Sequence, residues 1–129
     1  MLTEHEIEIR VRYQETDGQG HVHHANYLTY FEQGRVEMLR AGGKDYREFE
    51  KQGLFLIIAG VSVRYYLPAY FDDVLRLTTT TVRAKGVRII HKYRLMRGDE
   101  LVADGETTVA CIDRDGKLTK LPDWMRLDA

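Results

Sequence analysis

One loop of the sequence, residues 15–24, concentrates most of the side chains that can do chemistry, and it leads directly into a predicted helix over residues 26–41. The loop holds a carboxylate, Asp17, and three histidines: His21, His23 and His24. A helix start presents unpaired N–H groups and positive potential, which can hold a carbonyl oxygen as it gains negative charge. A nearby aspartate can then attack the carbonyl carbon or activate water. The pattern favours acyl transfer with Asp17 as the reacting group.

Simpler interpretations of the same loop remain open. Asp17 is followed by Gly18, and Asp-Gly is a common turn. His24 can also be read as a residue that simply lines the helix start. The histidines can bind a metal, but they lack a partner cysteine or an acidic cluster, so we expect neither a metal site nor a cofactor.

Other reaction classes are disfavoured. The single serine, Ser62, lies in a predicted strand and lacks the final glycine of a nucleophile elbow. The single cysteine, Cys111, also lies in a predicted strand, has no histidine close in sequence and is expected to pack in the core. No P-loop or dinucleotide-binding glycine pattern occurs.

The helix over residues 26–41 is predicted from its apolar spacing. Its inward face is expected to hold four residues: Tyr27, Phe31, Gly34 and Met38. Gly34 allows close approach to another backbone. Asn26 is the expected N-cap, and Gly42-Gly43 end the helix.

Strands are predicted before and after this helix. Residues 6–13 alternate, with one face made by Ile7, Ile9, Val11 and Tyr13. A short second helix is expected within residues 44–53. Four further strands are expected at residues 54–66, 74–84, 87–96 and 101–113. Consecutive strands with such short links are expected to pair antiparallel. We therefore predict an α+β hotdog fold, a long central helix wrapped by a five-stranded antiparallel sheet, in one domain of residues 1–129.

The composition limits the cellular location and the binding partners that we expect. The chain has 129 residues, a formal net charge of −1 and one cysteine, so no internal disulfide is possible. No charge excess favours nucleic acid or an anionic membrane. The first residues lack the apolar run of a signal peptide, and no apolar run is long enough to span a bilayer. We expect a cytoplasmic protein that neither binds nucleic acid nor integrates into a membrane.

Two blocks carry a family resemblance. Residues 12–28 read RYQETDGQGHVHHANYL and are followed by Tyr30, Phe31, Glu32 and Arg35; residues 66–75 read YLPAYFDDVL. Both blocks resemble hotdog thioesterases of the 4-hydroxybenzoyl-CoA thioesterase type and the related acyl-CoA thioesterases of the bacterial Tol–Pal system. With the order of elements, the resemblance covers nearly the whole chain. It departs at His21, where close relatives often carry an aliphatic residue, and at residues 57–60, which lack the Ser or Thr of some members.

The resemblance implies specific roles. The catalytic aspartate falls on Asp17, and the backbone amide that polarises the carbonyl falls at or next to His24, itself part of the site in the Tol–Pal-like branch. Four residues would contact the substrate: Asn26 and Tyr27 at the helix start, and Lys85 and Arg88 as basic residues for CoA.

The implied activity is hydrolysis of an acyl-CoA thioester to free acid and CoA, with Asp17 as nucleophile or general base and no cofactor. The implied assembly is a homodimer, and further a homotetramer, because one small sheet leaves an edge exposed. Two rival functions remain. One is a hotdog-fold hydratase or dehydratase that acts on acyl thioesters, and the other is a non-catalytic acyl-CoA-binding protein. The sequence does not identify the acyl group.

Overall fold

The computed structural model of the chain describes residues 2–127. Its strands form one antiparallel sheet in the order β1-β3-β4-β5-β2. The strands are β1 (Glu4–Arg10), β2 (Phe55–Tyr65), β3 (Val74–Lys85), β4 (Arg88–Arg97) and β5 (Glu100–Ile112). The described helices are α1 (Asn26–Ala41), α2 (Tyr46–Lys51) and two 3₁₀ turns at Tyr13–Glu15 and Asp123–Met125. Within residues 2–127, no helix combines the length and the apolar character needed to cross a bilayer.

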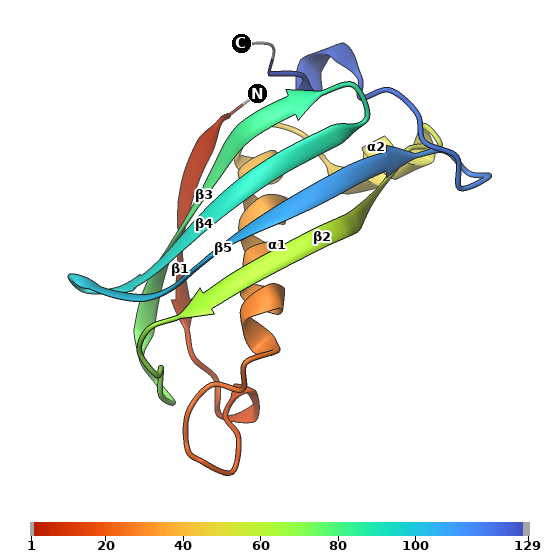
Figure 1. Cartoon of the computed structure of the whole chain (residues 1–129). Helices are drawn as coiled ribbons and strands as arrows, with labels where there is room; N and C mark the ends of the chain where they lie inside the picture. The colour runs from red at the N-terminus through yellow and green to blue at the C-terminus, as the bar shows by residue number, and fades with distance from the viewer. Residues whose placement is uncertain (1, 128–129) are drawn as a thin grey trace.

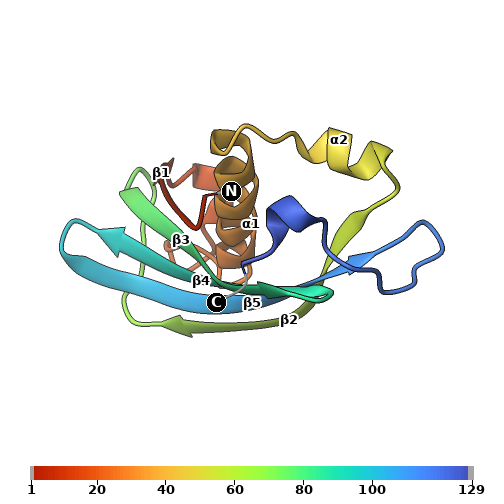
Figure 2. The same cartoon turned by 90° about the horizontal axis from the view of Figure 1, so that it is seen from above.

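Helix α1 lies along the concave face of the curved sheet (Figures 1 and 2). The inward face predicted from the spacing is confirmed, because all four of its residues are buried: Tyr27, Phe31, Gly34 and Met38. Gly34 lies so close to β3 that an added Cβ would collide with Thr79 Oγ1 and Leu77 Cδ2. A glycine is therefore required where the helix crosses this strand.

The predicted elements are confirmed in type and order. The bounds of α1 match the prediction, and β2 to β5 each begin and end within one residue of the predicted strands. The short second helix is present as α2. A long helix wrapped by a five-stranded antiparallel sheet is the predicted hotdog architecture, so the α+β fold class is confirmed.

Two details of the prediction are wrong. β1 ends at Arg10, and Tyr13 lies in a 3₁₀ turn with 76% of its surface exposed instead of extending the buried face. β2 does not pair with its sequence neighbour β3 but with β5. The two-residue links of β3 to β4 and of β4 to β5 fix these three strands as neighbours, which leaves the outer edge of β5 for β2 and that of β3 for β1.

β2 forms one edge of the sheet and is strongly apolar on its surface. Four large apolar side chains of this strand are exposed: Ile57, Ile58, Val61 and Tyr65. A long apolar edge strand has unpaired N–H and C=O groups beside hydrophobic side chains, so it invites pairing with another strand.

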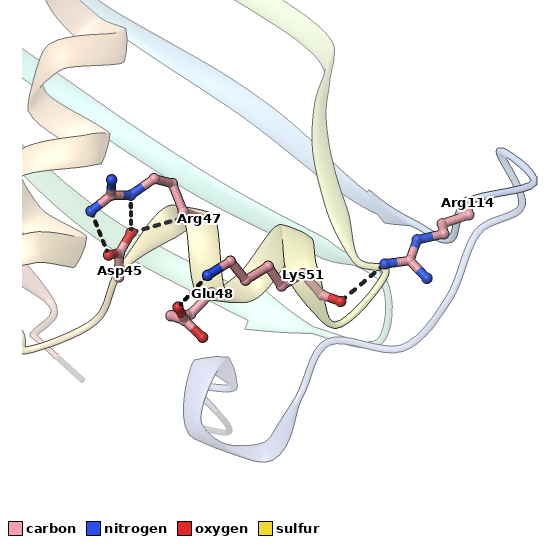
Figure 3. A network of polar contacts seen from close by, with 5 residues as sticks. All are labelled: Asp45, Arg47, Glu48, Lys51 and Arg114. Atoms are coloured by element: carbon pink, nitrogen blue, oxygen red, sulfur yellow. Dashed lines mark hydrogen bonds and ion pairs between the residues drawn. The ribbon is translucent and has the colours of Figure 1, made fainter.

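α2 lies just before the start of β2 and forms polar contacts at both of its own ends (Figure 3). Asp45 caps it by accepting from the Arg47 N–H at 2.8 Å and pairs with the Arg47 guanidinium. Lys51 pairs with Glu48, and Arg114, which follows β5, donates to the Lys51 carbonyl at 3.0 Å. Exposed contacts of this kind contribute little energy each. The Asp45–Arg47 and Lys51–Glu48 pairs lie within α2 and its cap, whereas the Arg114 contact links α2 to the segment that follows β5.

Candidate active site

The loop between β1 and α1 folds back on itself as a small hairpin, which lies at the bottom of Figure 1. The Asp17 N–H donates to the His21 carbonyl at 2.9 Å, and the His23 N–H donates to the Glu15 carbonyl at 2.9 Å. Asp17 therefore lies at the tip of the hairpin. The returning arm delivers the chain to the start of α1.

Asp17 organises the hairpin tip. Its carbonyl accepts from the Gly20 N–H, and its Oδ1 accepts from the Gln19 N–H, both at 2.9 Å. Gly20 has a φ of 86°, which favours glycine. The turn expected from Asp-Gly is thus present. The second carboxylate oxygen, Oδ2, forms no hydrogen bond to any residue between 2 and 127, and the side chain is half-buried.

The chain contains a second copy of this turn, at residues 113–117 beyond β5. The Asp113 N–H donates to the Lys117 carbonyl, the Gly116 N–H donates to the Asp113 carbonyl, and the Asp115 N–H donates to Asp113 Oδ1. Gly116 has a φ of 80°. The turn alone therefore does not distinguish Asp17. What distinguishes it is the helix start to which its hairpin returns.

The buried carboxylate of Glu15 fixes the hairpin to Arg12 and to Tyr30 of α1. It is only 7% exposed and accepts from the Arg12 N–H at 2.8 Å, from Arg12 Nε at 3.1 Å and from the Tyr30 hydroxyl at 2.9 Å. Burial, together with the hydrogen bond to Glu15, raises the pKa of Tyr30. Sequence reasoning missed this residue, because nothing in its local pattern shows that a loop glutamate meets a tyrosine of α1.

The start of α1 differs from the prediction. The N-cap residue is Ala25, which has no side-chain cap, and Asn26 is the first helical residue. The Asn26 side chain instead donates from Nδ2 to the Glu15 carbonyl at 2.8 Å, which ties the helix start to the hairpin. Tyr65 of β2 donates its hydroxyl to the His24 carbonyl at 3.0 Å. This second contact was also missed, because strand and loop are distant in sequence.

Some backbone donors at this helix start have no acceptor among the described residues, namely the N–H groups of His24 and Tyr27. The N–H groups of His23, Ala25 and Asn26 each have an acceptor. In the part of the chain that the structure describes, the His24 N–H has none. It lies where the positive end of the α1 dipole is strongest, so it can hold a developing oxyanion.

The three histidines do not converge. The rings of His23 and His24 stack on each other at 4.2 Å, and both side chains are exposed, whereas His21 is half-buried. Among residues 2–127, no group of three or more His, Cys, Asp or Glu side chains is arranged to hold a metal ion.

Known proteins share this fold and this chain's sequence pattern. Residues 11–127 match the model of the thioesterase-like superfamily. The chain is 35% identical over 106 residues to the acyl-CoA thioesterase YbgC of Haemophilus influenzae, covering 81% of this chain and 78% of the relative. It is 32% identical over 111 residues to the acyl-CoA thioester hydrolase YbgC of Escherichia coli O157:H7, covering 81% and 79%. The chain belongs to the thioesterase-like superfamily.

A solved structure supports the same assignment. The DHNA-CoA thioesterase from Staphylococcus aureus superposes with a TM-score of 0.90 at 29% identity, covering 95% of this chain and 87% of that protein. The predicted resemblance to hotdog thioesterases and the predicted enzyme class, a thioester hydrolase, are confirmed.

Not every predicted site residue of this thioesterase lies near Asp17. Tyr27 is 3% exposed and packs against Tyr30 and Tyr65, so it supports the helix start from within the core. Lys85 and Arg88 are exposed on either side of the β3–β4 turn, at the opposite end of the sheet from the hairpin (Figure 1). Within one chain, these two basic residues do not reach Asp17.

Neither alternative nucleophile of the thioesterase fits. Cys111 is fully buried, and burial raises the pKa of its thiol, which keeps it protonated. Ser62 lies on β2 opposite Glu106 of β5, and strand alternation puts it on the other face from Tyr65, which contacts His24. Asp17 is left as the candidate reactive group, on the hairpin whose returning arm leads to the His24 N–H.

Proposed function

We propose that this protein hydrolyses an acyl-CoA thioester to the free acid and CoA, with Asp17 as the reacting carboxylate. The names of the relatives support CoA thioesters as the substrate class. The observation that carries the assignment of Asp17 is the free His24 N–H at the start of α1, next to the returning arm of the Asp17 hairpin.

The thioester carbonyl oxygen would accept from the His24 N–H, where the helix dipole favours negative charge. In one route, Asp17 Oδ2 attacks the carbonyl carbon, the C–S bond breaks, and the CoA thiolate leaves and takes up a proton. Water then hydrolyses the mixed anhydride. In the other route, Asp17 accepts a proton from a water molecule whose oxygen attacks the same carbon. Both routes use the carboxylate oxygen that the turn leaves free.

The neighbouring residues act by positioning. Asn26 and Tyr65 hold the backbone on either side of the His24 N–H through bonds to the carbonyls of Glu15 and His24. The buried Glu15 fixes the hairpin to Tyr30 of α1. A donor that is already held in place stabilises developing charge without reorganising during the reaction, so these contacts would favour catalysis. The exposed His24 ring would lie against the thioester and orient it.

We further propose a homodimer that pairs β2 with β2 of a second copy. This pairing would bury the exposed apolar edge and extend two sheets into one. A two-fold axis through β2 reverses one copy relative to the other. The α1 start of one copy then lies at the same end of the joined sheet as Lys85 and Arg88 of the other, which is how these residues would reach CoA. Association of two dimers into a tetramer stays a prediction.

A thiol-release assay with the purified full chain tests the function. Short, long and aromatic acyl-CoAs are compared, and a short enoyl-CoA is included. We expect free CoA from at least one acyl-CoA. A hydrated product with CoA still attached would instead indicate a hydratase, and acyl-CoA binding without thiol release across the panel would indicate a binding protein.

A further inference from the structure

The concave face of the sheet carries a row of polar residues under the middle of α1. Thr81 of β3 lies opposite His91 of β4, and His91 lies opposite Thr107 of β5. All three are buried. The row runs between two separate apolar clusters, one around Phe31 and one around Phe49. Polar groups in such a place need partners, because leaving them unpaired in a core is costly.

A cavity of about 370 Å³ opens beside this row, between the second half of α1 and the sheet. Most of its wall is apolar, as at Val36, Leu56 and Ile89, whereas Arg35 and His91 add polar groups. A largely apolar pocket with a few polar groups is the usual form of a small-molecule site.

His91 has no structural partner that would explain its burial. It is 7% exposed, and its Nδ1 has no hydrogen-bond partner within residues 2–127. Burial and the nearby Arg35 lower the pKa of His91 to about 4, so the ring is neutral near pH 7 and can both donate and accept. A buried polar atom without a partner costs on the order of 1–3 kcal/mol, which a ligand can recover.

Arg35 projects from α1 toward the same row. Its Nη1 donates to the Tyr93 hydroxyl at 3.0 Å, and that hydroxyl lies 2.6 Å from Thr107 Oγ1. Among the described residues, Arg35 forms no ion pair with a carboxylate, although Glu32 lines the same cavity. A guanidinium has five N–H donors, so most of them remain available.

The cavity adjoins a second space that lies nearer the helix start. A smaller space of about 170 Å³ between α1 and β2 is lined by Leu28 and Val61, and it shares Glu32, Arg35 and Ile58 with the cavity. Arg35 is nine residues after Asn26, or roughly 13 Å along the helix. Together the two spaces form a groove that follows α1 from Leu28, four residues after His24, to Arg35 and beyond.

We propose that this groove holds the acyl group of the thioester, and that Arg35 and His91 select acyl groups with an oxygen acceptor at their far end. The inference rests on the proposed function and adds the substrate class. At about 30 Å³ for each water-sized group, the cavity takes about a dozen non-hydrogen atoms. The oxygen can belong to a hydroxyl or to a carboxylate, since N–H donors suit both.

Matched acyl-CoAs test the proposal. Linear acyl groups of about six to ten carbons, each ending in a methyl, a hydroxyl or a carboxylate, are compared by kcat/KM for thiol release. The variants are Arg35→Met, His91→Phe and His91→Gln. Arg94→Met is the matched control, because Arg94 lies exposed on β4 at a position opposite in alternation to His91 and Tyr93. Thermal melting verifies that each variant is folded, and Arg35→Met stands alone if the His91 variants do not fold.

We expect the wild type to prefer an oxygen-ended group over its methyl-ended match by about tenfold or more. Arg35→Met and His91→Phe should bring this ratio near one, and Arg94→Met should leave it unchanged. Binding of the oxygen-ended product acid should also shift the His91 ring signals in NMR spectra, and the methyl-ended acid should not. Comparing kcat/KM for the hydroxyl-ended and the carboxylate-ended acyl-CoAs shows which of the two groups is preferred.

An unchanged ratio in both variants, or a wild-type preference for methyl ends at every length, would overturn the inference and leave the hydrolase intact. Absence of thiol release from every substrate would instead overturn the proposed function.

Discussion

Replacing Asp17 with asparagine separates the role of its charge from its role in the turn. The amide oxygen can still accept from the Gln19 N–H, and the side chain keeps its size. The substitution removes only the negative charge and the free nucleophilic oxygen. We therefore expect Asp17→Asn to change the free energy of unfolding by less than about 0.5 kcal/mol. We expect it to lower kcat by at least about a hundredfold, which corresponds to roughly 2.7 kcal/mol of barrier.

Asp113→Asn is the matched control, since Asp113 makes the same three turn contacts without a helix start beside it. For 129 residues, an unfolding entropy of about 2.1 cal/mol/K per residue gives roughly 0.27 kcal/mol per degree. A change of 0.5 kcal/mol would therefore move Tm by only about 2 °C. Both variants should melt within this range of the wild type, and Asp113→Asn should keep full turnover.

The assay is steady-state thiol release with the best acyl-CoA, which gives kcat and KM separately. Loss in kcat with little change in KM indicates an interaction made in the transition state. Because the introduced asparagine precedes Gly18 and such pairs deamidate back to aspartate, each preparation is verified by mass spectrometry. Turnover within about threefold of the wild type in intact Asp17→Asn would refute the assignment of Asp17. An equal loss in Asp113→Asn would refute the reasoning from the helix start.

Three further outcomes are expected. Glu15→Gln removes charge-assisted bonds to Arg12 and Tyr30 and should cost about 2–3 kcal/mol, a fall in Tm of roughly 7–11 °C; a fall under about 2 °C would contradict the anchoring role. Val61→Asp should turn a dimer into a monomer by light scattering, whereas Val82→Asp, equally exposed on β3, should not; retention of the dimer in both would exclude pairing through β2. His91 is held neutral with its pKa lowered from 6.5 to about 4, so the unfolded chain binds its proton first as pH falls. The wild type should therefore lose about 2 kcal/mol of stability between about pH 7 and pH 5, and His91→Gln should lose less over the same range by urea unfolding.

The sequence could predict the elements of the fold but not all of their neighbours. Apolar spacing is a local signal, so it placed α1 and the ends of β2 to β5 well. The pairing of β2 with β5 depends on which strand edges the tight β3–β4 and β4–β5 turns leave free, and no pattern within β2 contains that information. Tyr13 was placed inside because alternation continues past the point where the chain leaves the sheet.

The loop of the candidate site was predictable where the signal is local. Asp17 and the start of α1 are nine residues apart in sequence, so a loop that leads from one to the other could be foreseen. Asn26 was predicted to be the N-cap from its residue type. Its side-chain amide instead donates to the Glu15 carbonyl of the hairpin at 2.8 Å. The contacts of Glu15 with Tyr30 and of Tyr65 with His24 join residues far apart in sequence, so only the folded chain reveals them.

For His91, strand alternation gives the correct face of the sheet but does not indicate why a histidine stands there. Alternation along β4 puts His91 on the same face as Ile89, Tyr93 and Leu95, and all four are buried. The same rule calls for an apolar residue there, and an unpartnered histidine is costlier than leucine at such a position. Stability alone does not favour that choice. A residue that breaks the pattern of its strand, lines a cavity and lies beside an arginine with no ion-pair partner among residues 2–127 is better explained by what binds there.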